Sequence, residues 1–448
     1  MLQQSLQVNT SYKQILSIAL PIAASILVPQ INFITNNVFL SHLNAEALAL
    51  AGITGVYYLV FAVCGNGLNA GLQALISRRA GENNTNGIGQ LFQQGVWIAM
   101  ALSIVGILLT YLLAPTILGF SLHDEQRVAD AVAFLKIRIW GLPFLYVYQM
   151  RNALLVGTNN SRFLVIGTLA ETLANVVLDY GFIFGKLGLP NLGLMGAAYA
   201  SVLAEITGLV VIFAVMRWQG LYQKFQLFGL QKFDWTAAKQ ILDQSAPLVL
   251  QYAISVGSWE FFYILIEHHG TESLAVSNVM RNVFGLCGCL SWAFAATSTS
   301  MVSNVIGQGR EDWVIPLIKK LMGLSVAYSA TIAILLNIFP TQFLSIYGQN
   351  EHFTQLAIPV LRIVSSALVL MSISTVWLNA LVGTGNSRLN LRIEIVAIVL
   401  YIVYTYTVLE KWNMPITWGW ASEMLYWTSM FIPSYWYMMS GRWKGKKI

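Results

Sequence analysis

Long apolar runs dominate the chain, and short polar stretches separate them. A transmembrane helix needs about 20 mostly apolar residues, so each such run predicts one membrane-spanning helix. An outer-membrane barrel would instead show alternating segments of about ten residues. The pattern therefore predicts an all-α polytopic membrane protein with twelve transmembrane helices, at residues 15–39, 48–72, 91–115, 130–156, 163–185, 195–216, 243–266, 274–300, 314–340, 355–382, 390–409 and 415–440.

The composition agrees with this class. The chain has 448 residues, of which 56% are hydrophobic and 10% charged, and its mean hydropathy is +0.64. A soluble protein is about 25% charged, and a disordered one is poor in hydrophobic residues, so neither class fits. The net charge of +6 does not indicate nucleic-acid binding, because the basic residues are scattered over short loops.

The basic residues predict how the chain is oriented. If both termini lie on one side, the opposite side holds only Arg127, Lys186 and Lys411. Lysine and arginine collect in cytoplasmic loops, so both termini are expected in the cytoplasm. The side with the termini then holds seventeen basic residues, namely Lys13, Arg78, Arg79, Arg162, Arg217, Lys224, Lys232, Lys239, Arg310, Lys319, Lys320, Arg388, Arg392, Arg442, Lys444, Lys446 and Lys447.

The chain repeats itself at a constant offset of 226 residues. Residues 155–162 (LVGTNNSR) match residues 381–388 (LVGTGNSR) at seven of eight positions, and Ser77 and Gly81 fall on Ser303 and Gly307. Six helices return the chain to the side on which it began, so the two halves are parallel repeats. Such repeats suit a transporter with a substrate site between its halves. We expect one six-helix lobe at 1–222 and a second at 223–448.

Acidic residues inside the predicted helices are candidate functional groups, because a charge in the membrane is costly. Glu171, Asn175 and Asp179 follow one another at i, i+4 and i+8, which places them on one face of a helix, and Ser201 and Glu205 follow the same rule. Together they predict a pocket for Na+ or H+ in the first half. The alternative is that these groups only hydrogen-bond neighbouring helices together.

The second half lacks this stripe, because Tyr401 and Thr405 stand at the equivalents of Asn175 and Asp179. It offers Glu260, which either forms a static ion pair with Arg281 or takes part in coupling or substrate binding. In the first predicted helix, Pro21 can produce a kink.

Motifs for an enzyme are missing. The sequence has no HExxH, GxSxG or Walker A motif, so neither catalysis nor direct use of ATP is expected, and an ion gradient remains as the energy source. The three cysteines lie in apolar runs and read as core residues rather than as a metal site or disulfide.

The chain resembles the multidrug and toxic compound extrusion (MATE) family over nearly its whole length. The resemblance rests on the twelve helices in two parallel halves, on Pro21, and on several short motifs in a shared order, at residues 67–75, 79–81, 156–162, 175–180, 183–185 and 196–201. It implies a secondary antiporter that exports bulky, often cationic organic compounds in exchange for H+ or Na+, with no other cofactor.

The resemblance also implies roles for particular residues. Asn175, Asp179 and Ser201 match three groups of the family's first-half cation site, with Na+ expected at Asp179 and Asn175, while Asn36 occupies the place of an acid in the first helix. Glu171 and Glu205 are expected to support this site, and Glu260 resembles the acid of one subgroup. A family tyrosine and a second-half acid are replaced by the two residues Phe134 and Met371.

Two other functions stay open at this point. One is a lipid-linked oligosaccharide flippase of the same superfamily, although such flippases tend to line their cavity with several cationic residues, and the other is an ion channel. We expect small-molecule substrates, a lipid bilayer as the surroundings, no nucleic-acid partner, a monomer, and a multi-pass location in a bacterial inner membrane.

Overall fold

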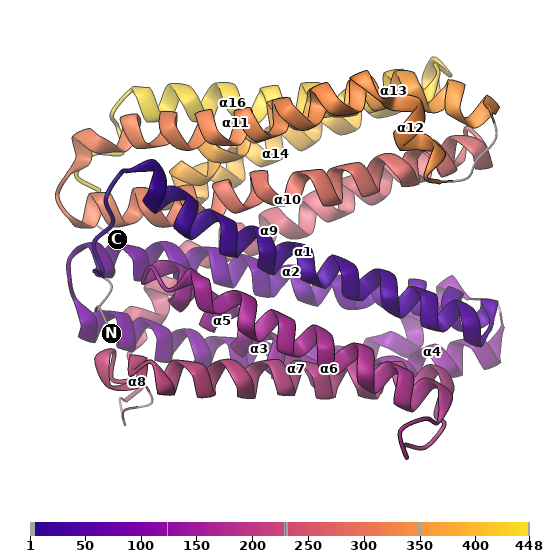
Figure 1. The fold of residues 1–448 in the computed structure, drawn as a ribbon, viewed down its shortest axis with the longest axis horizontal. Coiled ribbons are helices and arrows are strands. Elements are labelled where there is room, and N and C mark those ends of the chain that lie inside the picture. The colour runs from indigo at the N-terminus through magenta and orange to yellow at the C-terminus, as the bar shows by residue number, and fades with distance from the viewer. Residues whose placement is uncertain (1–4, 123, 228, 230–231, 348–350, 447–448) are drawn as a thin grey trace.

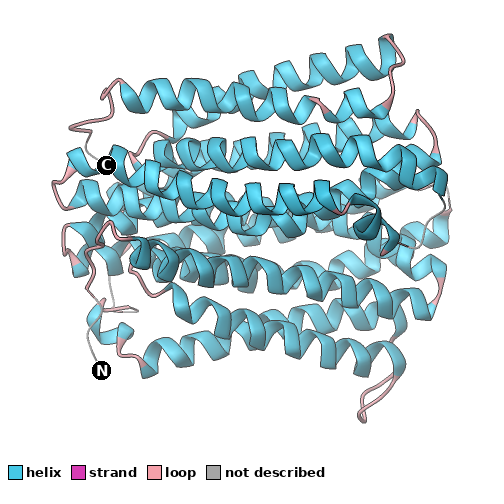
Figure 2. Cartoon of the chain, turned by 45° about the horizontal axis from the view of Figure 1, so that its top comes forward, coloured by secondary structure: helices cyan, strands magenta, loops and turns pink. Residues whose placement is uncertain are grey.

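The computed structural model describes residues 5–122, 124–227, 229, 232–347 and 351–446. Their regular structure is helical throughout, and the loops gather at the two ends of the molecule (Figure 2). The first half contains α1 (Tyr12–Leu43), α2 (Ala45–Gly81), α3 (Thr85–Ser121), α4 (Glu125–Arg138), η1 (Ile139–Gly141), α5 (Leu142–Gly157), η2 (Ser161–Phe163), α6 (Leu164–Phe184) and α7 (Gly193–Trp218).

A short helix, α8 (Leu221–Lys224), follows the first half. The second half contains α9 (Trp235–Glu267), α10 (Thr271–Gly307), η3 (Glu311–Trp313), α11 (Val314–Ile338), α12 (Pro340–Ser345), α13 (Glu351–Gly383), α14 (Ser387–Thr405), η4 (Tyr406–Lys411), α15 (Ile416–Trp420) and α16 (Ser422–Met439). The two halves lie one above the other in Figure 1. Gln7 donates to the Gly81 carbonyl and Arg78 donates to the Lys446 carbonyl, so both ends of the described chain lie at the same end of the molecule, here named the terminal end. The opposite end is named the far end.

Helix ends follow local rules. The side chain of Ser11 accepts a hydrogen bond from the backbone of Gln14 and begins α1, and Asn44 ends α1 and caps α2 in the same way through Ala47. Such caps satisfy backbone groups that the first turn leaves without partners. Gly185 ends α6 with a φ of 65°, a conformation that glycine adopts without a steric cost.

Ten helices in the described part of the chain are long and apolar enough to cross a membrane. The two other predicted spans, 130–156 and 415–440, run through broken helices: α4, η1 and α5 form the first, and α15 and α16 form the second. A hydropathy window bridges these breaks, because apolar residues outnumber the few charged ones beside them, Lys136 and Arg138 at the first break and Glu423 at the second. Large apolar side chains cover the outside, as a lipid environment requires, with 71% of Leu112 and 62% of Val210 exposed.

The two halves share a large and a small apolar core at the terminal end and have separate cores at the far end. The largest core joins Leu75 of α2 to Val305 of α10 and Leu381 of α13. At the far end, one core is built from α9 to α16 only, and two smaller cores from α1 to α7 only. The halves are therefore packed together at the terminal end.

The contacts between the halves are symmetric. A Cβ atom on Gly81 would lie 2.1 Å from the carbonyl oxygen of Asn304, and one on Gly307 would lie 2.3 Å from that of Arg78. These two pairs are related by the offset of 226 residues. Between them, the hydroxyls of Ser77 and Ser300 lie 2.7 Å apart. Glycine is required at both positions, because any side chain would push α2 and α10 apart.

Candidate functional site

Asp179 is a buried carboxylate on α6. It is 0% exposed, and neither of its oxygens has a hydrogen-bond partner among the residues that the structure describes. One turn earlier, Asn175 is 2% exposed, and its Nδ2 atom is also without a partner there. Buried polar groups are nearly always hydrogen-bonded, so such a pair indicates a binding site for a group that the structure does not contain.

The far half of α1 faces the same part of α6. The rings of Phe39 and Tyr180 are 6.4 Å apart, which sets α1 and α6 at the same level. The Oδ1 atoms of Asn32 and Asn36 are buried and have no partner in the described structure. Asn32, Asn36 and Asp179 thus each have a buried oxygen without a partner on these two packed helices, and amide and carboxylate oxygens are the ligand types that a hard cation prefers.

Ser201 and Pro21 are the two other groups predicted to act with Asp179 in the first half. Ser201 is half-buried on α7, and since Asp179 lacks a partner, the two are not hydrogen-bonded. Pro21 lies inside α1, which runs as one helix from Tyr12 to Leu43. A kink at Pro21 therefore does not interrupt α1 in this conformation.

Glu205 belongs to an ion pair that the sequence did not indicate. The guanidinium of Arg138, at the end of α4, donates to Glu205 at 2.7 Å and 3.1 Å, and the Tyr58 hydroxyl lies 3.4 Å from the same carboxylate. Arg138 also stacks on the Tyr58 ring at 3.9 Å. Glu205 is therefore paired with Arg138, and its predicted support of the Asp179 site stays a prediction. A lone arginine within an apolar run was the available signal, since it requires an acidic partner.

Glu171 and Asp179 do not share one environment. Glu171 lies against α7, because a Cβ atom on Gly208 would come within 2.8 Å of the Glu171 Cβ. It lies close enough to Arg151, Arg138 and Glu205 to interact with their charges. Glu171 therefore contributes to a charged cluster with α7, and Arg138 of this cluster is also close enough to Asp179 to act on its charge.

Arg151 completes this charged cluster. It is 0% exposed on α5, and its guanidinium stacks on the Tyr148 ring at 3.8 Å. Its nitrogens have no hydrogen-bond acceptor among the described residues.

In the second half, Glu260 and Arg281 do not form the static ion pair that was one of the two predicted alternatives for Glu260. Both side chains are exposed, no ion pair joins them in the described structure, and Arg281 instead lies 5.4 Å from the centre of the Tyr263 ring. Phe134 and Met371, which replace polar family residues, are buried in apolar cores.

Two second-half carboxylates that had no evident partner in the sequence are held by neighbouring helices. Glu394 of α14 accepts from Ser255 at 2.7 Å and from Gln251 at 3.2 Å, both on α9. Glu423 of α16 accepts at 3.0 Å from the ring nitrogen of Trp427. Ser255 and Gln251 are far from Glu394 in the sequence, so only the packing of the helices reveals them, whereas Trp427 lies one turn after Glu423 on the same helix.

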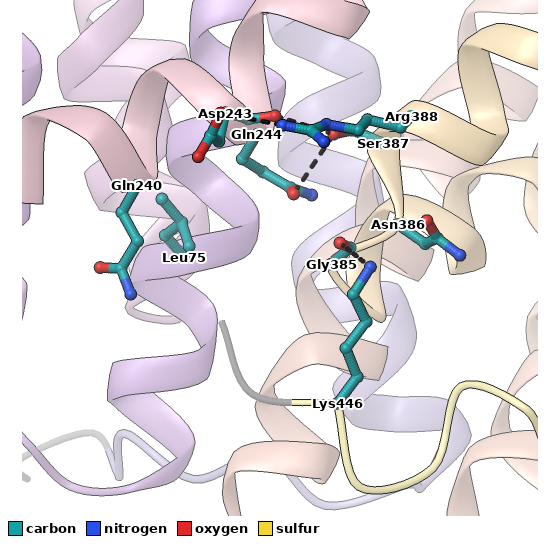
Figure 3. A pocket seen from close by; sticks show the side chains of 9 residues that line it. All are labelled: Leu75, Gln240, Asp243, Gln244, Gly385, Asn386, Ser387, Arg388 and Lys446. Carbon is teal, nitrogen blue, oxygen red and sulfur yellow. Dashed lines mark hydrogen bonds and ion pairs between the residues drawn. The ribbon is translucent and has the colours of Figure 1, made fainter.

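A polar pocket lies at the terminal end, beside the repeated turn at residues 385–388 (Figure 3). Arg388 binds Asp243 at 3.1 Å, and Lys446 donates to the Gly385 carbonyl at 2.8 Å. Burial, helped by the charge of Arg388, lowers the pKa of Lys446. Lys446 thus lines one side of the pocket and ties the C-terminal segment to the repeated turn.

The described residues contain no group of three or more histidine, cysteine or acidic side chains that could hold a metal ion. Asp179 offers a single carboxylate, and the asparagines of α1 and α6 add neutral amide groups, a set that suits one small monovalent cation or a proton. A buried carboxylate that takes and releases such a cation can couple its movement to a change in helix packing.

Two parallel six-helix halves, packed at one end and carrying buried carboxylates in the spans, define a secondary membrane transporter and not an enzyme. The MatE family model matches residues 21–181 and again residues 247–407. The second match lies 226 residues after the first, the offset of the internal repeat. The chain therefore belongs to the MatE family of transporters.

Relatives and solved structures agree with this assignment. The chain is 24% identical to a probable multidrug resistance protein NorM of Synechocystis sp., over 86% of this chain and 85% of the relative. It is 25% identical to the NorM protein of Thermotoga maritima, over 84% and 80%. A MOP superfamily transporter from Pyrococcus furiosus, described as having a binding pocket of reversed polarity, superimposes with a TM-score of 0.87 at 17% identity and 98% coverage of both chains.

An outward-facing multidrug resistance MATE transporter of the same superfamily superimposes with a TM-score of 0.84 at 18% identity, again with 98% of both chains covered. At these identities the solved structures show that the fold is shared.

Proposed function

We propose that this protein is an antiporter of the cell membrane that exports bulky organic compounds in exchange for H+ or Na+. The observation that carries the proposal is Asp179, which is fully buried without a partner among the described residues. Its family membership and the NorM relatives support the class of substrate. The excess of basic residues at the terminal end supports a cytoplasmic position for both termini.

The coupling cation binds at Asp179 and Asn175, and Asn36 faces it from α1. Ser201, half-buried on α7, supplies a neutral hydroxyl to the site. Arg138 is close enough to act on Asp179 electrostatically, and the Arg138–Glu205 pair, together with Glu171, sets the local charge. Binding of the cation removes the cost of an unpartnered buried carboxylate and thereby favours one packing of α1 on α6.

Substrate binds between the halves, which share no apolar core at the far end. Glu260 and Arg281, both exposed, are candidates for substrate contact. Because their charges are opposite, they do not give the substrate region the strong positive charge that is typical of an oligosaccharide flippase. An ion channel would need no buried coupling carboxylate. The chain acts as a monomer that spans the bacterial inner membrane, with lobes at 1–222 and 223–448.

The test uses the purified chain in proteoliposomes, with fluorescent organic cations as substrate and with pH and Na+ gradients imposed separately. Wild-type protein exports dye against its gradient when one of the two ions is supplied. The Asp179→Asn variant stays folded but loses gradient-driven export, because it cannot exchange a charge. Asp312→Asn, at an exposed carboxylate with 92% of its side chain accessible, is the matched control. Export by Asp179→Asn at the wild-type rate would overturn the assignment.

A further inference from the structure

Glu394 lies near the middle of α14, in a polar network that three helices of the second half build. It is 3% exposed. Ser255 and Gln251 of α9 bind it at 2.7 Å and 3.2 Å, and the Tyr426 hydroxyl of α16 donates to the same carboxylate oxygen as Ser255. Asn390, one turn before Glu394, donates to the side-chain oxygen of Gln251. The network is distinct from the Asp179 site, which α1 and α6 form in the other half.

No lysine, arginine or histidine in the described structure lies within 4.0 Å of Glu394. The first-half carboxylate Glu205 differs in this respect, because Arg138 neutralises it. An ionised carboxylate with only neutral neighbours is costly to bury, so Glu394 requires a positive partner that the protein does not supply.

The hydrogen bonds around Glu394 lack one hydrogen when its carboxylate is ionised. The Ser255 hydroxyl lies 2.9 Å from the Gln251 backbone carbonyl and 2.7 Å from Glu394, yet it carries a single hydrogen. With an ionised carboxylate, both neighbours are acceptors, and one contact has no hydrogen. With a proton on Glu394, the carboxyl group donates to Ser255, and Ser255 donates to the carbonyl.

An unpartnered polar atom points to the same conclusion. Asn390 is 2% exposed, and its Oδ1 atom has no partner in the described part of the chain, although its Nδ2 atom is bound into the network.

The other titratable groups near Glu394 are Tyr252 of α9 and Tyr426 of α16, and Glu423 of α16 lies beyond Tyr426. All of these groups are neutral or acidic, so none of them can take the place of the missing positive charge.

We propose that Glu394, held by Ser255, Gln251 and Tyr426, is a second proton-binding site, located in the second half of the transporter. A proton from the solvent binds the Glu394 carboxylate and returns to solvent when the packing of α9, α14 and α16 changes. Its part in transport rests on the antiport proposed above, whereas proton binding itself does not.

The experiment records infrared difference spectra of the purified full-length chain in lipid nanodiscs between acidic and alkaline pH, without substrate. The wild type should show a protonated-carboxyl band that Glu394→Gln loses. Glu410→Gln, at an exposed carboxylate beside His268, is the matched control and should keep the band. Asp179→Asn should also keep it. A Glu394→Gln protein with the complete set of wild-type carboxyl bands would overturn the proposal.

Two further measurements complete the test. If Glu394→Gln does not fold, Tyr426→Phe keeps the carboxyl group and removes one donor, so the pH midpoint of the band should move, and an unchanged midpoint would contradict the site. Binding of radioactive Na+ distinguishes the cations, because loss of Na+ binding in Glu394→Gln without a change in the carboxyl bands would replace the proton by Na+. In proteoliposomes, Glu394→Gln should move fewer protons for each dye molecule exported. If wild-type dye export fails while the band titrates, the antiport is wrong and the proton site stands.

Discussion

Arg138 and Glu205 carry opposite charges inside the first half, and their geometry decides how each behaves. Two hydrogen bonds of 2.7 Å and 3.1 Å join them, and 16% and 7% of their side chains are exposed. An ion pair of this kind contributes little net stability, because both charges lose their hydration. Removing one partner is costly, since the remaining charge is then buried alone.

We expect Arg138→Met to lower the free energy of unfolding by about 3–5 kcal/mol. The double variant Arg138→Met with Glu205→Leu should recover much of this loss, because no charge is left without a partner. The measurement is reversible unfolding in mixed micelles. The control is Arg388→Gln, which breaks the exposed pair with Asp243 and should cost less than about 1 kcal/mol. Equal losses at the two sites would show that Arg138 and Glu205 are solvated.

At the scale of elements, the break between α4 and α5 brings this ion pair together. The turn at Ile139–Gly141 separates the two helices, and Pro143 begins the next one without needing a backbone donor. A Cβ atom on Gly141 would lie 2.0 Å from the Glu205 carboxylate and 2.5 Å from the Arg138 guanidinium. Glycine at this position is what lets α7 approach the break.

The variant Gly141→Ala should therefore separate Arg138 from Glu205 and reduce thermal stability, although alanine favours a helix more than glycine does. Gly119→Ala in α3 is the matched control, because a Cβ atom there meets nothing within 4 Å. We expect a lower melting temperature for Gly141→Ala and an unchanged or higher one for Gly119→Ala. The same effect in both variants would mean that helix propensity, and not the ion pair, dominates.

The repeated turn explains the one mismatch between the two copies of its motif. Asn159 and Gly385 occupy the same place and both have positive φ, at 62° and 85°. Asparagine and glycine are the residues that tolerate this conformation best. Each turn also binds one end of the chain: Asn159 donates to the carbonyls of Ser5 and Leu6, and Lys446 donates to Gly385.

At the scale of the whole molecule, contacts between the halves are concentrated at the terminal end. Arg78 reaches from α2 to the Gly383 carbonyl at 3.2 Å, and Gln73 reaches the Ala296 carbonyl at 2.8 Å. The N-terminal segment 5–10 spans both halves, because Asn304 and Lys320 bind it from the second half while Asn159 binds it from the first. Opening the molecule at this end would require all of these contacts to break.

A disulfide between α2 and α10 at the terminal end should stop transport. The three native cysteines, Cys64, Cys287 and Cys289, are first replaced by serine. Ser77→Cys and Ser300→Cys then place two thiols where two hydroxyls now lie 2.7 Å apart. Oxidation should abolish dye export in proteoliposomes, and a reducing agent should restore it. Each single cysteine variant is the control for oxidation. Continued export by fully cross-linked protein would show that this end does not open.

Removing residues 2–10 should weaken the contact between the two halves at the terminal end without unfolding either half. The hydrogen bonds from Asn304, Gln308 and Asn159 to the segment would be lost. We expect a cysteine placed at Ala74, which is 0% exposed, to react faster with a thiol reagent in the truncated chain than in the full chain. An unchanged rate would show that α2 and α10 hold the end closed alone.

The sequence by itself determined the spans, the repeat and the distribution of charge. These features are local or periodic, because a helix satisfies its own backbone in a membrane and needs only length and apolar composition. The ends of α4 and α15 were not predicted, because apolar composition over about 20 residues indicates a span whether or not the helix is continuous.

Only the tertiary structure decided which polar groups meet. Helical spacing put Glu171, Asn175 and Asp179 on one stripe, yet α7 attracts the first and α1 faces the last. Arg138 and Glu205 are 67 residues apart, and Glu394 is 143 residues from Gln251. Spacing along a helix shows which residues share a face, but it does not show which helix that face meets. That choice depends on packing and on charge pairs, which form only when distant helices come together.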